Sequence, residues 1–387
     1  MLAPTSVATA SEQRRSRDWF AFGGEISGSY GSEDDGHFND TEYERNTLQL
    51  LRITFSLEVK PTERFTFLTE LRSDNFDAVR AYALFLRIHP WLSRSFDVQI
   101  GRIPPVFGAF SRRRYDSDNP LIGYPLGYQY LTPVRSDAAP RTTEELLAQR
   151  GHGTFTSYSL GESAPRSGLP VVDPLRWDTG IQARLGSRPV ELSVAVTQGT
   201  LSNPRVDDDN GEKQIAGRLA LRPMASIVLG LSAARGSYLS DALKDALPGN
   251  SGRAVHQRAL GVDFEYSRGY WLFRTEGIWS EWGVPLELQP ELSESMSTWT
   301  ITAEGSYTLF PGFHAAARID HMAFSRLNDA VGSATWDAPV SRLEAGVGYA
   351  VARNLLIKGS YQYNWRDGGP ISSEGLVAAQ VSYWFWR

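Results

Sequence analysis

The 387-residue sequence contains no cysteine and only four lysines, Lys60, Lys213, Lys244 and Lys358. The missing cysteines exclude disulfides, zinc–thiolate sites and cysteine nucleophiles, and their absence fits a protein of the cell envelope. Because lysine is rare, nearly all positive charge is arginine, whose planar fork binds carboxylate and phosphate bidentately. The formal net charge of -5 leaves no basic surplus to displace phosphate counterions, so we expect no nucleic-acid partner.

Catalytic and metal-binding patterns are also missing. The six histidines are scattered without metal-ligand spacing, and the sequence has neither a GxSxG elbow nor a phosphate-binding P-loop. We therefore expect no enzymatic activity, no cofactor and no metal. A polysaccharide enzyme with tryptophan platforms and paired carboxylates ranks lower, because the acidic residues are spread along the chain and form no obvious pair.

No run of apolar residues approaches the ~20 that a membrane-spanning helix needs. Hydropathy alone would therefore indicate a soluble chain, but a barrel strand is apolar only at every second position. The 35 glycines, 11 tryptophans, 16 tyrosines and 18 phenylalanines favour many strands and turns over long helices.

Alternation with a period of two runs along the chain from Trp19 onward. From Leu51 to Val59 the odd positions are apolar, and the even positions between them are charged or polar. After a short break at Pro61, residues 64–74 alternate again, as the partner strand of a hairpin should. The pattern predicts about sixteen strands, an even number typical of outer-membrane barrels. They are expected at 19–30, 46–60, 64–74, 79–89, 95–103, 177–186, 190–200, 213–222, 226–237, 256–266, 270–281, 298–309, 313–324, 341–351, 355–366 and 376–387.

The breaks between these strands alternate between tight turns and longer polar loops. Short periplasmic turns and long outer loops are the arrangement of outer-membrane barrels. The predicted fold class is therefore all-β, a transmembrane antiparallel up-and-down β-barrel in the bacterial outer membrane with both termini periplasmic. Aromatic residues that flank the apolar stretches favour membrane girdles. A soluble sandwich, propeller or solenoid is the alternative interpretation, because its strands alternate as well.

We expect one barrel domain over residues 19–387. Residues 1–18 are either a signal-sequence remnant, since Ala8-Thr9-Ala10 resembles a signal-peptidase site, or a disordered polar tail. Residues 104–176 form a long third loop, and a loop of this length in a compact domain is usually functional or disordered. Its tyrosines, glycines and prolines favour an ordered loop, and residues 142–148 predict a short helix with a capping box.

The stretch Gly-Arg-Ile-Pro-x-x-Phe-Gly, Gly101 to Gly108, stands where the fifth predicted strand leads into this loop. A sixteen-strand barrel with this stretch resembles the phosphate-selective porin O/P family. The resemblance implies a third loop folded into the lumen as a constriction, an anion channel for small solutes, and a homotrimer. Family members use lysines as well as arginines along the path, whereas lysine is nearly absent here. At the constriction the resemblance places Arg102, Arg112, Arg113 and Arg114.

Inward-facing charges near the third loop are expected to line the pore wall. Arginine rings make partial dehydration less costly for anions, and opposed acids create a transverse field. The wall residues predicted for this role are Arg52, Arg72, Arg87, Arg184, Asp97 and Glu70. Alternatively, the wall charges form a structural ladder, and the Arg112–Arg114 cluster is an exposed loop that pairs with nearby acids or binds lipopolysaccharide.

The sequence thus predicts a passive outer-membrane porin for small hydrophilic solutes, with anions among the candidates. The alternative is a barrel that holds a plug, lipoprotein or cytochrome without conducting solutes. Outer-membrane lipids, lipopolysaccharide and the barrel-assembly machinery are the other expected partners. The last is expected because the ending VSYWFWR, with Tyr383, Phe385 and Trp386, resembles a C-terminal assembly signal. Val381, Tyr383 and Phe385 share one parity, so this ending is predicted to be the final strand that pairs with the first.

Overall fold

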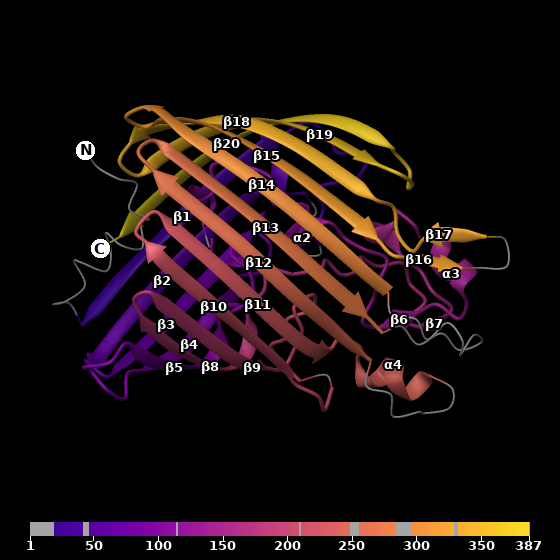
Figure 1. Ribbon diagram of the computed structural model, residues 1–387, viewed down its shortest axis with the longest axis horizontal. Helices are drawn as coiled ribbons and strands as arrows, with labels where there is room; N and C mark the ends of the chain where they lie inside the picture. The colour runs from indigo at the N-terminus through magenta and orange to yellow at the C-terminus, as the bar shows by residue number, and fades with distance from the viewer. Residues whose placement is uncertain are drawn as a thin grey trace.

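Sixteen strands form one closed antiparallel barrel in the computed structural model (Figure 1). The structure describes residues 19–41, 46–113, 115–208, 210–247, 255–283, 296–328 and 332–386. The barrel closes where β1 (Phe20–Gly31) pairs with β20 (Ser373–Trp386), with Gly23 opposite Trp386 and Gly31 opposite Ala378. The predicted barrel and the predicted pairing of the last strand with the first are confirmed, whereas the predicted tail or signal remnant, residues 1–18, lies outside the described residues.

The other wall strands follow the predicted ones closely. In chain order they are β2 (Leu51–Thr62), β3 (Phe65–Asp74), β4 (Arg80–Ile88), β5 (Phe96–Ile103), β8 (Asp178–Ser187), β9 (Val190–Thr197), β10 (Gln214–Met224), β11 (Ile227–Ser237), β12 (His256–Arg268), β13 (Trp271–Trp282), β14 (Met296–Phe310), β15 (Phe313–Phe324), β18 (Val340–Ala352) and β19 (Leu355–Arg366). Two further two-stranded sheets lie in the loops and pair β6 (Ala138–Ala139) with β7 (Leu160–Gly161), and β16 (Arg326–Asn328) with β17 (Ser333–Thr335).

Helices are short and lie in the loops. They are α2 (Leu126–Gln129), α3 (Thr143–Leu147), α4 (Asp241–Ala246) and the 3-10 turns η1 (Thr47–Gln49), η2 (Phe110–Arg112), η3 (Asp116–Asp118) and η4 (Gly153–Phe155). The helix predicted at residues 142–148 is present as α3, and the Thr142 side chain caps it by accepting from the Glu145 N–H at 3.3 Å. None of the described helices is long and apolar enough to cross a membrane.

Strand β2 begins at Leu51, later than the predicted start at residue 46. The Asn46 side chain accepts a hydrogen bond from the Leu48 N–H at 2.9 Å and caps the η1 turn. A short polar side chain that bonds to its own backbone competes with strand pairing. This cap therefore removes the turn from the wall, although the alternation of these residues also fits a strand.

The two faces of the wall differ in chemistry. On β10, Ile215 is 61% exposed on the outer face, while Ala216 and Arg218 between the outward residues are buried. Pairs of aromatic rings gather on the outer face next to the short turns, such as Trp271 with Tyr307 at 4.5 Å between centroids. An apolar outer band edged by aromatic rings is the surface that a barrel presents to lipid.

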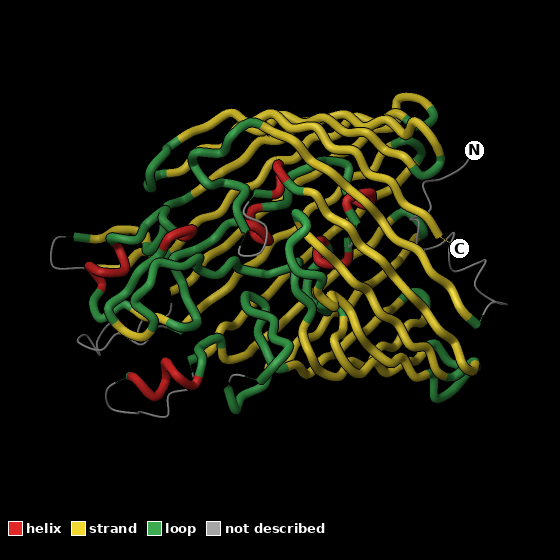
Figure 2. Tube along the Cα trace, turned by 180° about the vertical axis from the view of Figure 1, so that it is seen from behind, coloured by secondary structure: helices red, strands yellow, loops and turns green. Residues whose placement is uncertain are grey.

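The two rims of the barrel also differ. One rim, here named the short-turn end, carries two-residue turns such as Gly269–Tyr270 and Pro311–Gly312, together with the start of β1 and the end of β20 (Figure 1). The opposite rim, the long-loop end, carries the longer connections (Figure 2), including the part of the third loop with β6, β7 and α3 (Figure 1). A periplasmic position of the short-turn end stays a prediction.

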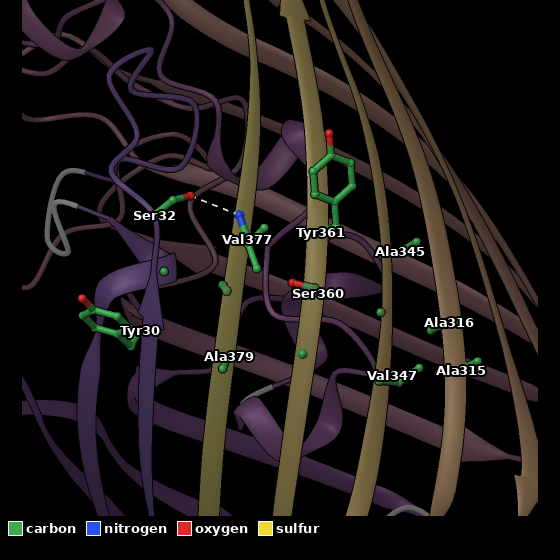
Figure 3. A pocket seen from close by; sticks show the side chains of 14 residues that line it. Tyr30, Ser32, Ala315, Ala316, Ala345, Val347, Ser360, Tyr361, Val377 and Ala379 are labelled. Carbon is green, nitrogen blue, oxygen red and sulfur yellow. Dashed lines mark hydrogen bonds between the residues drawn. The ribbon is translucent and has the colours of Figure 1, made fainter.

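A shallow hollow of about 960 Å³ lies on the outer face across β15, β18, β19, β20 and β1 (Figure 3). Small residues such as Ala315, Ala345 and Ala379 form its floor, and Tyr30 and Tyr361 stand beside it. Because Tyr361 is 50% exposed and the residues on either side of it are buried, the hollow belongs to the outer surface and not to the lumen.

Candidate functional site

The third loop leaves the wall through two glycines of the quoted motif. Gly101 and Gly108 have φ values of +126° and +79°. A Cβ at Gly101 would overlap the Leu84 carbonyl oxygen, and one at Gly108 would overlap the Tyr128 hydroxyl. Only glycine adopts such angles without strain where the backbone also approaches so closely. These two positions therefore explain the motif as a local exit from β5.

After the motif, the loop reaches the inner face of strands far from β5. The Gly108 N–H donates to the Ser232 hydroxyl on β11 at 3.1 Å, and the Ala109 N–H donates to Glu276 Oε1 on β13 at 2.8 Å. The Tyr128 hydroxyl donates to the same Glu276 oxygen at 2.7 Å. Two separate parts of the loop are thus fixed to one buried carboxylate of the wall.

An apolar core lies between the loop and the wall toward the long-loop end. Phe107 and Leu126 are fully buried and belong to one cluster with the inward-facing Ile278, Trp282 and Met322. Burial of large apolar side chains contributes roughly 1.5–3 kcal/mol each. This core therefore anchors the loop to the wall, and the wall side chains beneath it have little contact with water.

Arg112 points into a different environment, toward the short-turn end. Its side chain is exposed to water, yet protein atoms surround it on most sides. Burial and the nearby Arg218 lower the pKa of Arg112, and Glu191, Arg184 and Arg222 also act on its charge. Within the described part of the chain, neither Arg112 nor the half-buried Arg184 has an ion pair.

Arg113 is engaged in a buried network. Its guanidinium lies 2.9 Å from Glu304 Oε1 on β14 and 5.0 Å from the centroid of the Phe110 ring. Glu304 also meets Arg274 at 3.4 Å and Arg318 at 3.6 Å. Burial lowers the pKa of Arg113, and the Glu304 carboxylate opposes this effect. Arg113 therefore anchors the loop to the wall, and its charge is balanced.

Arg102, another predicted constriction residue, lies elsewhere. Arg102 is opposite Leu84 in the register and shares the outward parity of Ile100, which is 42% exposed. Its guanidinium donates to the Trp177 carbonyl at 2.9 Å and to the Ala81 carbonyl. This placement puts Arg102 on the parity of the outer face of β5. Arg114 lies outside the described residues.

Three of the predicted wall residues are buried next to the loop. Arg52 meets Asp74 at 3.0 Å and donates to the Tyr124 hydroxyl at 2.8 Å. Arg72 meets the same Asp74 at 3.2 Å, and Glu70 accepts from the Tyr115 hydroxyl at 3.1 Å. Arg52 and Glu70 thus connect β2 and β3 to the loop, while Arg72 and Arg52 share Asp74 within the wall.

The remaining predicted wall residues lie near the short-turn end. Arg87 and Asp97 are half-buried, and the Arg87 Nε lies 3.8 Å from Asp97 Oδ1. Asp97 is directly opposite Arg184 in the register of β5 and β8. Arg222 completes this region with an ion pair to Glu191 at 3.0 Å. Arg184 and Arg222 both act on the charge of Arg112, so these three arginines lie in one region, with Asp97 opposite Arg184.

Several residues of the site were not among the predicted ones. Arg222, Glu191 and Glu304 have inward parity, so the alternation that predicted the wall could have included them. Glu25 and Lys358 are also inward and almost fully buried against the loop. No local signal distinguishes a wall charge that faces water from one that the loop covers. Among the described residues, no group of three His, Asp or Glu side chains is placed to hold a metal ion.

Comparisons with known proteins identify the fold. No protein-family model matches the chain, and no curated protein matches it. Solved structures match almost over their whole length. The in-vitro folded OmpT, an outer membrane protein of Vibrio cholerae in a trimer form, has a TM-score of 0.54 at 10% identity, covering 95% of this chain and 100% of that one.

Two further solved structures are similar to the same extent. OmpF of Salmonella typhi in complex with daunomycin has a TM-score of 0.53 at 12% identity, with 95% of this chain and 97% of that chain covered. An anion-selective porin from Comamonas acidovorans has a TM-score of 0.53 at 9% identity, with 95% and 99% covered. At such identities the likeness establishes the fold alone, so this chain has the sixteen-strand fold of bacterial outer-membrane porins, and membership of the phosphate-selective O/P family stays a prediction.

Proposed function

We propose that the protein is a passive outer-membrane channel of low conductance for small hydrophilic anions. The observation that carries the proposal is the pair Arg112 and Arg184, two water-accessible guanidinium groups near each other that have no ion pair within the described residues. Arginine keeps its charge at any physiological pH. Positive charges that form no ion pair in an aqueous lumen favour anions over cations.

The surroundings of this pair support the same preference. Arg222 adds a third guanidinium to the region, while Glu191 is the acid that pairs with it. In a narrow passage a solute loses part of its hydration shell, and fixed guanidinium groups make this loss less costly for an anion. Diffusion past such groups requires neither a cofactor nor chemistry by the protein.

The packing of the third loop supports a low conductance. We propose that the loop lies in the lumen and narrows it toward the long-loop end. The inward-facing Arg342 and Gln362 on that side are at most 1% exposed. Because the loop covers these wall side chains, the passage that remains is narrow. A narrow passage admits small solutes and excludes larger ones.

Assembly and placement complete the proposal. We propose an outer-membrane homotrimer with both termini periplasmic, in contact with lipid and lipopolysaccharide. The trimer is supported by the similar OmpT structure, which is of a trimer form, and anion preference by the similar porin from Comamonas acidovorans, which is anion-selective. The Gly101–Gly108 motif supports a relationship to the phosphate-selective O/P family.

Conductance of the purified protein in planar bilayers under a salt gradient tests the proposal. We expect small single channels whose reversal potential indicates anion preference, and a loss of most of that preference in Arg112→Gln/Arg184→Gln. Arg102→Gln is the matched control, because Arg102 bonds to backbone carbonyls on the outer face. Unchanged reversal potentials in the double variant would remove these arginines from the path. Absence of conductance, with a partner retained on gentle detergent extraction, would favour the scaffold function instead.

A further inference from the structure

The closing pair of the barrel, β1 and β20, differs from every other pair in the wall. Its two strands lie at opposite ends of the sequence, with Glu25 opposite Trp384 and Ser27 opposite Ser382. Every other neighbouring pair is joined directly by one connection of the chain, and several of these connections are two-residue turns that keep the strands together when their hydrogen bonds break. The entropic cost of closing a chain loop grows with its length. The pairing of β1 with β20, here named the seam, is therefore the wall contact with the least help from chain connectivity.

One short part of the third loop, residues 115–123, contacts strands on both sides of the seam. This part is named the loop head. On the β1 side, Glu25 accepts hydrogen bonds from the Asp116 N–H at 2.8 Å and from the Ser117 N–H at 3.3 Å. It also accepts from the Ser117 hydroxyl, while Ser27 donates to the Asp116 carboxylate. The first strand of the barrel thus binds both the backbone and the side chains of the loop head.

On the other side, β19 and β18 bind the same segment. The Lys358 ammonium on β19 donates to the backbone carbonyls of Asp116, Asn119 and Leu121 at 2.8, 3.1 and 3.2 Å. On β18, Glu344 Oε1 accepts from the Ile122 N–H at 3.2 Å and from the Gly123 N–H at 3.0 Å. Asp116 is therefore held from β1 by its N–H and from β19 by its carbonyl.

The last described residue of β20 also contacts the loop head. The ring of Trp386 lies 6.1 Å from that of Tyr115 in an edge-to-face arrangement. A Cβ at Gly23 would overlap the Trp386 ring, so the indole lies over the glycine of the opposite strand. The seam and the loop head consequently share a packed aromatic contact at the end of the chain.

The burial of these groups makes the contacts strong. Glu25 and Lys358 are each 2% exposed, and Glu344 is completely buried. All three ammonium donors of Lys358 are used by loop carbonyls, which is the full capacity of a lysine. Hydrogen bonds that involve a charged group are about twice as strong as neutral ones, and removing one partner leaves the other buried without compensation. Separating β1 from β19 and β20 would break these bonds together with the strand pairing.

We propose that the loop head acts as a bolt across the seam, with Glu25 and Lys358 as its positioning residues. The loop head binds in full only when β1 and β20 are paired, and its binding in turn holds those strands together. Closure of the barrel and placement of the third loop are therefore one coupled event. The proposal does not depend on conduction, because it concerns the strength of the seam.

The test compares two matched variants in the full-length protein by the temperature at which the compact barrel band converts to the unfolded band in detergent gels. Glu25→Gln removes a buried carboxylate that binds the loop at the seam. Glu276→Gln removes a buried carboxylate that binds the loop on β13, away from the seam. We expect Glu25→Gln and Lys358→Met to lower the conversion temperature by roughly 5 °C or more, and further than Glu276→Gln does.

A disulfide across the seam distinguishes two explanations for a loss of stability. In one, the loop head holds β1 and β20 together; in the other, loosening the loop destabilises the barrel in general. Gln380 donates to the Ser29 hydroxyl at 2.9 Å across the seam, and the chain contains no other cysteine that could mispair. In an oxidised Ser29→Cys/Gln380→Cys background, we expect Lys358→Met to lower the conversion temperature much less than it does alone. If Lys358→Met alone fails to assemble, we expect the disulfide to restore the compact band. An equal shift with Glu276→Gln, or no recovery in the locked background, would overturn the proposal.

Discussion

Arg113 and Glu304 form an ion pair of 2.9 Å that joins the third loop to β14, whereas the neighbouring Arg112 has no such partner among the described residues. The two arginines follow one another around a 3-10 turn and therefore point in different directions. One anchors the loop and the other faces water. Equal substitutions at the two positions should accordingly have different effects on stability and on permeation.

Arg113→Gln should destabilise the folded barrel by on the order of 3 kcal/mol, because it leaves Glu304 buried with fewer compensating charges. Arg112→Gln should change stability by less than about 0.5 kcal/mol, since its side chain faces water. Reversible urea unfolding in lipid vesicles measures both. The double variant Arg113→Gln/Glu304→Gln should be less destabilised than the sum of the two single changes. Similar losses for Arg112→Gln and Arg113→Gln would contradict the separation of roles.

Asp337 should make stability depend on pH. In the connection before β18, its Oδ1 accepts from the N–H groups of Gly151 and Ala338, both at 2.7 Å. Burial raises the pKa of Asp337 from an ordinary value of 3.8 to about 7. Between these two values the folded protein keeps a proton that the unfolded chain has released. The stability that the protonated Asp337 carboxyl contributes is therefore fully present below about pH 4 and is lost as the pH rises to about 7.

Asp337→Asn should remove this dependence. The variant and the natural protein should be about equally stable at pH 4, and the variant should be more stable at pH 8 by on the order of 2–4 kcal/mol. Urea unfolding at a series of pH values gives the difference directly. Asp367→Asn serves as the control, because that side chain is 87% exposed. The raised pKa of Asp337 would be contradicted if the difference in the free energy of unfolding between Asp337→Asn and the natural protein did not grow between pH 4 and pH 8.

Gly108→Ala should displace the start of the third loop. A Cβ at this position overlaps the Tyr128 hydroxyl, and the φ of +79° disfavours any other residue. We expect a stability loss of about 2 kcal/mol or more and irregular single-channel currents. Gly305→Ala is the matched control, since a Cβ at Gly305 meets no atom within 4 Å. Indistinguishable currents and stability in the two variants would mean that the turn at Gly108 is not needed.

The strands could be predicted from the sequence because their signal is local. Each strand of this barrel separates a lipid-facing row from an inward row, so a period of two appears in every segment without knowledge of its neighbours. The same rule could have placed Arg102 correctly, because it shares the parity of Val98 and Ile100. It was assigned to the constriction from the family motif, and the parity of β5 puts it on the outer face.

The third loop could not be predicted in the same way. Its position depends on contacts between residues far apart in the chain, such as Lys358 with the carbonyl of Asp116. Alternation shows that Lys358 faces inward, but not whether water or a loop covers it. Likewise, three consecutive arginines carry no local signal for which one meets Glu304. Parity thus predicts the wall, and the packing of the loop decides which wall charges face water.

The final strand should be essential for assembly. Deleting Val381 to Arg387 removes the partners of Gly23 to Gly28 on β1, so the seam cannot form along most of its length. Unpaired backbone groups in a lipid environment cost several kcal/mol each, and an open barrel edge is therefore not tolerated. We expect no compact, heat-modifiable protein in the outer-membrane fraction of cells that express the truncated chain.

Val381→Ala keeps the strand and should assemble normally. Tyr383→Ala and Phe385→Ala test the assembly signal itself, because their outward rings are available to the assembly machinery while the seam pairing stays intact. Normal amounts of compact truncated protein would show that neither the seam nor the signal requires these residues.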